Sequence, residues 1–370
     1  MKFSLLRRAV SATAASLLVM LLSAPASAAL APHLQTINYD KVATNGAYDE
    51  VFDGTSDQAV AVFDTGVDPD HLMFEGRSVN GQDQTGETLE SQPDWADPDG
   101  HGTAVGSVIA GNAATLQSQD VQLGGVAQGA AVVSVRVLGQ DGSGSFNDII
   151  SGMDYVIDQV KNGGPHANIE AINMSFGTTA TYTEAPSGSS TVRRFHDRAE
   201  TLNNLGVPIV AASGNGGDTD GLSFPAIDER VLAVGSSDGN GNISSFTNRS
   251  AELDLLAPGE NIWQAYQDDQ QNNLVARGSG TSYASPQVTG ALLLLDELIQ
   301  QRTGREPSAA ELRELVTTSG TTVRDGGLSV PRLDLSTSFE AVPAPEPASA
   351  IVFALGMLFM FSRRLRTIGR

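Results

Sequence analysis

Three side chains with complementary acid–base chemistry lie in short glycine-containing motifs, far apart in a chain of 370 residues. Asp64 precedes Thr-Gly at the end of an apolar run, His101 lies between two glycines, and Ser282 precedes a strongly apolar stretch. An imidazole accepts a proton near neutral pH, a carboxylate can orient that ring, and a serine hydroxyl attacks once a base takes its proton. The three residue types together predict nucleophilic catalysis.

Taken singly, each of these residues has an ordinary structural explanation. An Asp or Asn after a strand is commonly a turn residue, and a serine before an apolar helix is commonly a cap. Among the five histidines, His101 alone has glycines on both sides. Asn215, in Ser-Gly-Asn-Gly, offers the side-chain amide that an oxyanion hole needs. Catalysis is favoured because acid, base and serine occur in the order Asp64, His101, Ser282, one of the known orders of a Ser–His–Asp triad.

The segments between these motifs predict a parallel sheet covered by helices. Short apolar runs rich in β-branched residues alternate with stretches of helical spacing. Such alternation implies a three-layer α/β fold, with a mostly parallel central sheet and helices on both faces. In such folds ligands gather beyond the carboxyl ends of the strands. The runs expected as strands are 58–63, 131–138, 169–174, 207–212 and 231–234, and the expected helices are 102–113, 146–161 and 191–205.

Residues 60–295 resemble the subtilisin-like serine peptidases, the subtilase family. Four signatures carry the resemblance, in the order that the family has them: Asp-Thr-Gly-Val-Asp at 64–68, Asp-Gly-His-Gly-Thr at 99–103, Ser-Gly-Asn at 213–215 and Gly-Thr-Ser-Tyr-Ala-Ser-Pro at 280–286. The resemblance implies a serine endopeptidase that forms an acyl-enzyme on Ser282. His101 would be the general base, and Asp64 would hold its ring. Asn215 and the backbone N–H of Ser282 would bind the oxyanion.

By the same resemblance, a polypeptide substrate would lie extended between two protein segments and pair with them backbone to backbone. A pocket beside them would take the side chain before the scissile bond. No acidic residue is expected in that pocket, so we predict that uncharged, medium to large apolar residues are preferred there. The residues implied are Gly142, Ser143 and Gly144 on one side, Ser175, Phe176 and Gly177 on the other, and Ser213, Gly214 and Ser223 around the pocket.

Composition and charge exclude several classes of protein. The chain has no cysteine, which excludes disulfides, a thiolate nucleophile and Cys-ligated metal sites. Its net charge of −21 argues against nucleic-acid binding, because phosphates must be neutralised by basic groups. Serine chemistry requires no cofactor, and we expect no catalytic metal. Structural calcium could bind to hard oxygen ligands, although a solvated surface is the favoured interpretation of the acidic clusters Asp94, Asp97 and Asp99, and Asp218 and Asp220.

The first 28 residues are expected to be a signal peptide. Lys2, Arg7 and Arg8 form a positive start, an apolar run follows at 17–22, and Ala-Ser-Ala at 26–28 is a site for signal peptidase. The run is too short, and its flank too rich in small residues, for a transmembrane helix. We therefore predict export across the inner membrane to the periplasm, the cell envelope or the exterior. What remains ahead of the first motif is too short for the folded pro-domain of many subtilases.

The C-terminal end carries a second targeting segment. Pro-Glu-Pro at 345–347 is followed by an apolar run at 348–361 and by arginines, an arrangement that resembles the PEP-CTERM sorting signal. It implies processing by an exosortase-type sorting enzyme, with a plain membrane anchor as the alternative, and in either case membrane contact through this tail only. The expected divisions are the signal peptide (1–28), a short N-terminal arm (29–50), the catalytic domain (51–336), a proline-rich linker (337–347) and the apolar tail with its basic end (348–370).

Two alternative functions belong to different classes. A subtilase-fold protein that has lost activity could be a binding or matrix protein, but such a protein has no need for Asp64, His101, Asn215 and Ser282 together. An α/β-hydrolase esterase is disfavoured because its triad follows a different order along the chain. One departure from the family pattern is Tyr283, which stands where Met is usual. It takes no part in the proton relay.

Overall fold

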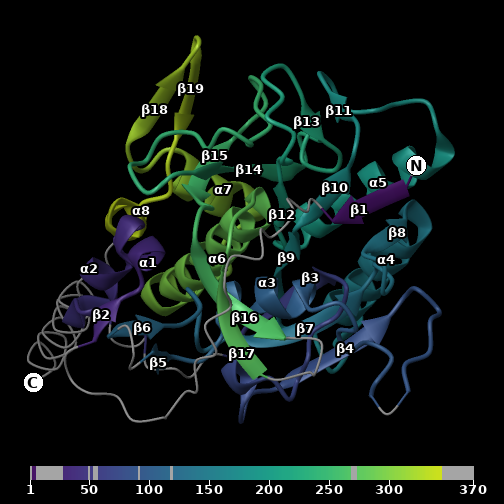
Figure 1. Ribbon diagram of the computed structural model, residues 1–370, viewed down its shortest axis with the longest axis horizontal. Helices are drawn as coiled ribbons and strands as arrows, with labels where there is room; N and C mark the ends of the chain where they lie inside the picture. The colour runs from purple at the N-terminus through teal and green to yellow at the C-terminus, as the bar shows by residue number, and fades with distance from the viewer. Residues whose placement is uncertain are drawn as a thin grey trace, which may run out of the picture.

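The computed structural model describes residues 2–5, 28–48, 51–52, 57–90, 92–116, 120–267 and 273–343. Most of the predicted signal peptide and the whole of the predicted tail lie outside these residues. The described chain is built around one large sheet (Figure 1). Within the described ranges, no helix is both long and apolar enough to span a bilayer.

The central sheet contains seven strands: β3 (Ala59–Asp64), β4 (Val79–Asp83), β7 (Ala131–Arg136), β9 (Ile169–Met174), β12 (Ile209–Ala212), β14 (Val231–Ser237) and β15 (Leu255–Pro258). All neighbours are parallel, in the order β15-β14-β12-β9-β3-β7-β4. The five predicted strands are confirmed, because continuous apolar runs are what a sheet buried on both faces requires. The edge strand β4 reads Val-Asn-Gly-Gln-Asp and is partly exposed, so it gave no apolar signal.

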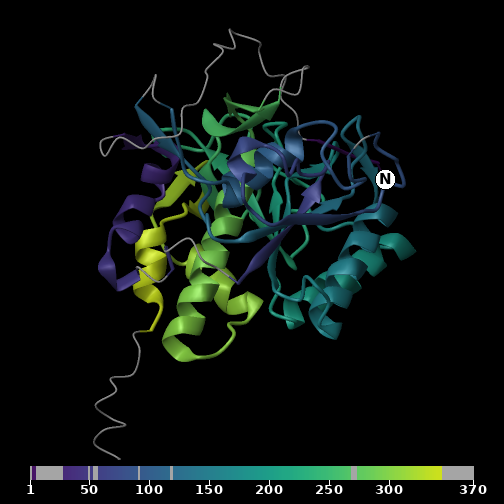
Figure 2. The same ribbon diagram turned by 90° about the horizontal axis from the view of Figure 1, so that it is seen from below.

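Four long helices cover the two faces of the sheet: α3 (His101–Ala110), α4 (Phe146–Asn162), α5 (Ser190–Asn204) and α6 (Thr281–Thr303) (Figures 1 and 2). Successive side chains of a strand point to opposite faces. Val60 and Val62 of β3 accordingly pack in the cluster that contains residues of α3 and α6. Ala61 and Phe63 pack in the other cluster, with α4 and α5. The expected three-layer α/β fold is confirmed.

Three short helices join the N-terminal arm to the end of the described chain: α1 (Pro32–Thr36), α2 (Tyr39–Ala43) and α8 (Leu335–Ala341). The purple α1 and α2 lie beside the yellow α8 in both ribbon views (Figures 1 and 2). Phe339 of α8 is fully buried, and its ring meets that of Tyr48 edge-on with centroids 5.0 Å apart. Residues 337–342, expected to begin the linker, therefore lie in the folded domain. Phe339 and Val342 fill a core that the arm also lines.

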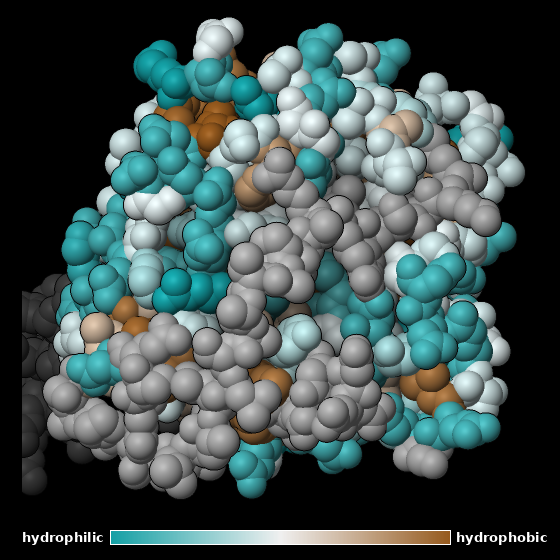
Figure 3. Space-filling view, viewed as in Figure 1, coloured by the Kyte–Doolittle hydropathy of each residue, from teal (hydrophilic) through white to brown (hydrophobic). Residues whose placement is uncertain are grey.

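The remaining elements are short: β1 (Lys2–Leu5), β2 (Ala29–Leu30), η1 (Gly46–Tyr48), η2 (Leu72–Phe74), β5 (Ala114–Leu116), β6 (Val121–Leu123), β8 (Ser143–Ser145), β10 (Phe176–Thr178), β11 (Thr181–Tyr182), β13 (Leu222–Ser223), β16 (Ile262–Gln267), β17 (Asn273–Gly278), α7 (Ala309–Thr317), β18 (Thr322–Asp325) and β19 (Leu328–Pro331). The described surface in Figure 3 is mostly hydrophilic. Among the described residues, Tyr266 is the only large apolar side chain that is exposed, at 39%. Such a surface agrees with the strongly negative net charge.

Candidate active site

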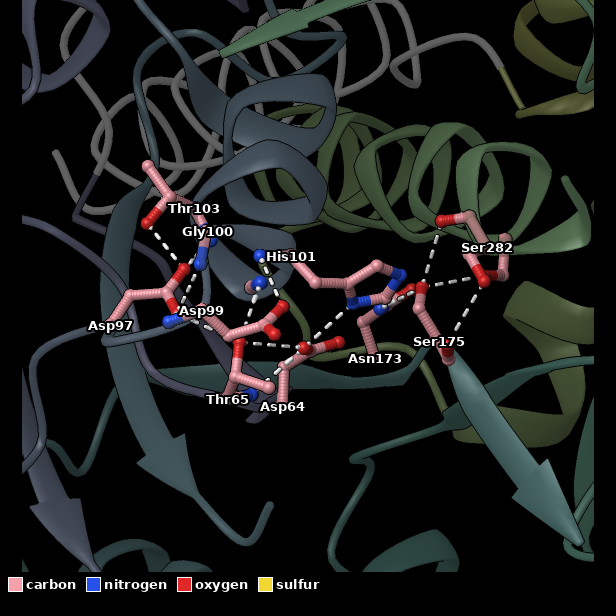
Figure 4. A network of polar contacts seen from close by, with 12 residues as sticks. Asp64, Thr65, Asp97, Asp99, Gly100, His101, Thr103, Asn173, Ser175 and Ser282 are labelled. Atoms are coloured by element: carbon pink, nitrogen blue, oxygen red, sulfur yellow. Dashed lines mark hydrogen bonds and ion pairs between the residues drawn. The ribbon is translucent and has the colours of Figure 1, made fainter. Parts of the chain in front are cut away.

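The structure brings Asp64 and His101 together at the carboxyl end of the central strand β3. Asp64 is the last residue of β3 and is fully buried. His101 opens α3, and its Nδ1 lies 2.8 Å from Oδ1 of Asp64 (Figure 4). The same Oδ1 accepts a hydrogen bond from the backbone N–H of Thr65 at 2.8 Å. Because an ionised carboxylate can only accept, Nδ1 carries the proton and Nε2 is left as the basic nitrogen.

Glycine at position 102 allows α3 to approach β3 this closely. A Cβ built on Gly102 would lie 2.0 Å from the carbonyl oxygen of Gly66, which is far inside van der Waals contact. Asp97 ties the same two segments together. One of its carboxylate oxygens accepts from Thr65 Oγ1 at 2.8 Å, and the other accepts from Thr103 Oγ1 at 2.6 Å. Asp97, which the sequence placed on a solvated acidic surface with calcium as the alternative, is therefore buried with both oxygens bound by protein donors (Figure 4).

The charges around His101 favour its protonated form. Burial alone would lower the pKa of His101, but the Asp64 carboxylate outweighs burial through its charge and its hydrogen bond. Asp99 and Asp97 act in the same direction, and the net result is a raised pKa. A raised pKa makes Nε2 a stronger proton acceptor. It also means that the neutral ring, which a general base must be, prevails only at higher pH.

Ser282 lies in the first turn of α6, and Figure 4 shows the His101 imidazole between Asp64 and the Ser175–Ser282 pair. The ring of Tyr283, the next residue, has its centroid 6.2 Å from that of His101. Ser282 Oγ donates its hydrogen bond to the carbonyl oxygen of Ser175 at 3.0 Å. The single hydroxyl proton is therefore directed to Ser175 in this conformation. Rotation about the Cα–Cβ bond would redirect it to the imidazole, and such bonds are often made only when substrate is present.

Pro286 explains how Ser175 comes to bond with the helix. Proline has no N–H, so the carbonyl of Ser282, four residues earlier, is left without its helical partner. Ser175 Oγ donates to this carbonyl at 2.9 Å, and Asn173 Nδ2 donates in turn to Ser175 Oγ at 2.9 Å. These bonds fix the end of β9 against the start of α6 at the candidate nucleophile.

Asn215 follows β12, and its side chain contacts the N-terminus of α6. Its Oδ1 accepts hydrogen bonds from the backbone N–H and from Oγ1 of Thr281, at 2.9 and 3.0 Å. Because a backbone N–H can only donate, the amide oxygen must face Thr281 and Nδ2 is directed away from it. The start of α6 also carries the positive end of the helix dipole. This corner of the site therefore suits a developing negative charge.

The two segments expected to flank a substrate lie on either side of the N-terminal strand β1. β8 pairs with β1 in antiparallel register, with Gly144 opposite Phe3, and β10 pairs with the other edge, with Gly177 opposite Ser4. The carboxyl end of β1 leads toward Ser175, since Leu5 lies opposite the next residue, Phe176. The structure thus forms a slot one strand wide, with Ser143 and Gly144 on one edge and Phe176 and Gly177 on the other. Gly142 lies in the turn before β8, where its N–H donates to the carbonyl of Gly139, and it does not pair with β1.

Ser213, Gly214 and Ser223 also lie together, and Asn248 joins them. The N–H of Ser223 donates to the carbonyl of Ser213 at 3.0 Å. Gly214 has a φ of +114°, and a Cβ there would lie 2.6 Å from Ser223 Oγ and 2.1 Å from Asn248 Nδ2. A Cβ on Gly177 would lie 2.8 Å from the Cβ of Ser223. Sequence reasoning missed Asn248, because it stands in none of the four signatures.

A group of carboxylates that could share a cation lies at the other end of the sheet. Among the described residues, Glu170, Asp296 and Glu306 form the one group of three acids close enough for this. Burial, reinforced by neighbouring carboxylates, raises the pKa of Asp296 to about 8 and that of Glu170 to about 7. Glu170 stands near the start of β9, so the group lies away from the candidate site. The acidic residues that the sequence suggested for calcium are not part of it.

Comparison with known proteins agrees with this geometry. The model of the subtilase family (Peptidase_S8) matches residues 55–332. The chain is 33% identical over 258 residues to the Major intracellular serine protease of Bacillus subtilis, covering 68% of this chain and 72% of that protein. It is 34% identical over 253 residues to the Subtilisin-like serine protease Pen ch 13 of Penicillium rubens, covering 68% of this chain and 56% of that protein. It is 35% identical over 240 residues to Subtilisin Savinase of Lederbergia lenta, covering 64% and 76%.

Proposed function

The chain belongs to the subtilase family of serine-type peptidases, and we propose that it is an exported endopeptidase that works through an Asp64–His101–Ser282 triad. The observation that carries the proposal is the 2.8 Å hydrogen bond between His101 Nδ1 and Asp64 Oδ1, with Ser282 beyond the ring (Figure 4). A binding or matrix protein that has lost activity is not favoured, because the relatives in the comparison are named as proteases.

Each chemical step follows from the donors and acceptors of the site. Ser282 Oγ turns from the Ser175 carbonyl to His101 Nε2, which takes the proton as the oxygen attacks the scissile carbonyl carbon. Asp64 keeps the ring in the Nδ1–H tautomer and stabilises the imidazolium. His101 then gives the proton to the leaving amine, and the acyl group stays on Ser282 as an ester. A water molecule, deprotonated by the same imidazole, hydrolyses the ester. None of these steps needs a cofactor.

The negative charge that forms on the carbonyl oxygen would be stabilised by two donors. One is Nδ2 of Asn215, and the other is the backbone N–H of Ser282. Support for the first comes from Thr281, whose two hydrogen bonds to Asn215 Oδ1 fix the orientation of the amide before any substrate binds. Donors held in place in advance need no reorganisation as the charge develops, which is why they accelerate the reaction.

The N-terminal strand supports binding of an extended peptide. β1 lies between β8 and β10 in a three-stranded antiparallel sheet, so both edges can pair with an extended chain. In this mode of recognition, main-chain hydrogen bonds give affinity and side-chain pockets give specificity. β1 also leads toward Ser175, whose carbonyl accepts the Ser282 hydroxyl. We infer that a polypeptide substrate takes the place of β1.

The side chain before the scissile bond is expected to be uncharged and apolar. The residues assigned to its pocket, Ser213, Gly214 and Ser223, are all neutral, as is the adjacent Asn248. A buried Lys or Arg would find no carboxylate among these four residues, and an unpaired buried charge is strongly disfavoured. A library of peptides cleaved chiefly after arginine would contradict this assignment.

Export and sorting are proposed from the two ends of this chain and not from the comparisons, in which one relative is named as intracellular. Signal peptidase would cut after residue 28, and an exosortase-type enzyme would process the tail, so that membrane contact is made through the tail only. Mass spectrometry of the protein from its host should find an N-terminus at residue 29 and a C-terminus ahead of residue 348. An intact chain from residue 1 to residue 370 would contradict both assignments.

A fluorophosphonate probe tests the catalytic proposal, because it labels only a serine that is activated by a base. The wild-type protein should be labelled, and S282A should not. S279A is the matched control, since Ser279 is exposed, lies three residues before Ser282 in the sequence and, within the described chain, accepts a hydrogen bond from the backbone N–H of Asn261. It should keep the label. A wild-type protein that is folded but unlabelled would refute the proposal and support the inactive alternative.

A further inference from the structure

Asn248, which no sequence motif marks, makes three hydrogen bonds to the loop that carries Asn215. Its backbone N–H donates to the carbonyl of Gly214 at 2.9 Å. Its Oδ1 accepts from the backbone N–H of Gly216 at 2.9 Å and from that of Asp218 at 3.1 Å. These bonds fall on both sides of Asn215. Asn248 is only 2% exposed, so water does not compete for them.

The loop needs such bonds because glycines surround Asn215. Gly214 and Gly217 have φ values of +114° and +69°, and glycine is the residue with the most backbone freedom to lose. A Cβ on Gly214 would lie 2.1 Å from Asn248 Nδ2, and one on Gly216 would lie 3.0 Å from Asn248 Oδ1. The amide of Asn248 thus occupies the space that the missing side chains leave, and it restrains the backbone there.

The loop that carries Asn215 is also held by hydrogen bonds to the start of α6. Thr281 donates twice to Asn215 Oδ1, and its own Oγ1 accepts from the N–H of Gly214 at 3.2 Å. The loop is therefore held between the start of α6 and the segment that follows β14. Thr281 fixes which way the amide of Asn215 faces, and Asn248 fixes where the backbone that carries the amide lies.

We propose that Asn248 is a positioning residue for the oxyanion hole, which keeps Asn215 Nδ2 where the negative charge forms. The inference rests on the proposed function, because it assigns Asn248 a role that acts through Asn215. A displacement of about 1 Å in a catalytic group can lower the rate by about 10²-fold. Loss of the hydrogen bonds from the loop to Asn248 should therefore lower kcat and leave KM nearly unchanged, because Asn215 Nδ2 meets a full negative charge only in the transition state.

A double-mutant cycle with Asn215 tests the proposal. N248A removes both bonds to Oδ1 and the 3.4 Å bond from Nδ2 to Ser223 Oγ, and it leaves the backbone bond to Gly214. In the wild-type background, N248A should lower kcat about 10- to 100-fold. In the N215L background it should lower kcat less than about threefold, because the group that it positions is already gone. KM on a peptide amide should change less than about threefold in either background. An equal loss of kcat in both backgrounds would overturn the inference.

Two further variants separate positioning from folding. N248D keeps an oxygen acceptor for Gly216 and Asp218, so it should recover most of the kcat that N248A loses. T247V is the matched control, because Thr247 is also buried but, among the described residues, its Oγ1 hydrogen-bonds with the backbone of Ser236 and not with the loop that carries Asn215. It should lower Tm and leave kcat unchanged. A T247V protein that loses as much kcat as N248A would contradict a specific role for Asn248.

The concentration of active enzyme in each variant is obtained by titration with the fluorophosphonate probe, so that partial unfolding does not enter kcat. Should N248A not fold, the cycle is run with N248S, whose shorter side chain cannot reach both N–H groups. Failure of the proposed function is recognised separately, as hydrolysis that persists in S282A. Additive losses in an enzyme that depends on Ser282 would refute the role of Asn248 alone.

Discussion

Substitution of Asn215 by leucine isolates the donor that the proposed mechanism needs most. Leucine has the same branching and the same number of side-chain heavy atoms as asparagine, but neither a donor nor an acceptor. In the structure, Asn215 Oδ1 is bound by two hydrogen bonds from Thr281, so Nδ2 is already oriented when the oxyanion forms. N215L should therefore lose the full stabilisation that a preorganised donor provides.

The expected loss in kcat is about 10²–10³-fold, or about 2.7–4 kcal/mol, a magnitude measured on a subtilisin and carried over to this chain. KM should stay within about threefold, because a neutral ground-state carbonyl gains little from the donor. N215D distinguishes the role of the Nδ2 donor from that of the oxygen that accepts from Thr281. It keeps an oxygen acceptor for both bonds from Thr281, yet it offers the oxyanion a carboxylate in place of an N–H donor.

The assay is steady-state hydrolysis of a peptide anilide, with active enzyme counted by fluorophosphonate titration and folding followed by Tm. Both N215L and N215D should lose kcat, and N215L should also lose some Tm because Thr281 is left without its acceptor. A rise in KM that parallels the fall in kcat would refute the oxyanion role. So would an N215D enzyme with wild-type kcat, since the anchor to Thr281 would then be all that matters.

Three more predictions follow from charge and strand pairing. The acid limb of the profile of kcat/KM against pH should report the raised pKa of His101, because activity falls as this base becomes protonated. D99N should move the limb to lower pH, because it removes a carboxylate that raises this pKa. The pKa of Asp296 is about 8 in the folded state, so its contribution to stability is complete below its ordinary pKa and is lost as the pH rises toward 8. D296N should therefore raise Tm at pH 9, by about 2–4 °C for each kcal/mol recovered. It should leave Tm unchanged at pH 4. A chain that starts at residue 29 should hydrolyse peptides faster than the full chain, because β1 occupies the slot between β8 and β10; equal kcat/KM for the two chains would contradict this.

The sequence predicted the strands and helices that have a recognisable pattern within their own residues. Apolar runs predicted the central strands, because both faces of a parallel sheet are buried and every position must be apolar. It did not predict β4, whose side chains alternate between buried and exposed at the edge of the sheet. It also began the proline-rich linker (337–347) at residue 337, whereas α8 continues to Ala341. The burial of Phe339 depends on Tyr48, and no pattern within either segment reveals a contact between the two ends of the chain.

Some residues of the candidate site could likewise be predicted from their own short motifs, and others depend on contacts between distant segments. Asp64, His101, Asn215 and Ser282 were found because each lies in a compact motif whose glycines permit a close approach. Asn248 acts through hydrogen bonds to a loop more than thirty residues away along the chain, so its role depends on how β14 and the following segment return to the loop. Asp97 was interpreted as part of a solvated acidic surface, with calcium as the alternative, whereas it is buried and its oxygens accept hydrogen bonds from the segments that carry the motifs.

The winding of the sheet explains why reactive residues so far apart in sequence meet. After β3 the chain moves outward to β4, returns through α3 to β7, and then crosses to the other side of β3 to form β9 and its successors. Connections from β3 and β9 thus leave in opposite directions, and such a reversal opens a crevice at the carboxyl ends of the strands. Asp64 ends β3, Ser175 follows β9, and α6 places Ser282 against Ser175. A chain with the same motifs but without this reversal would carry the residue types of a hydrolase and leave them on separate surfaces.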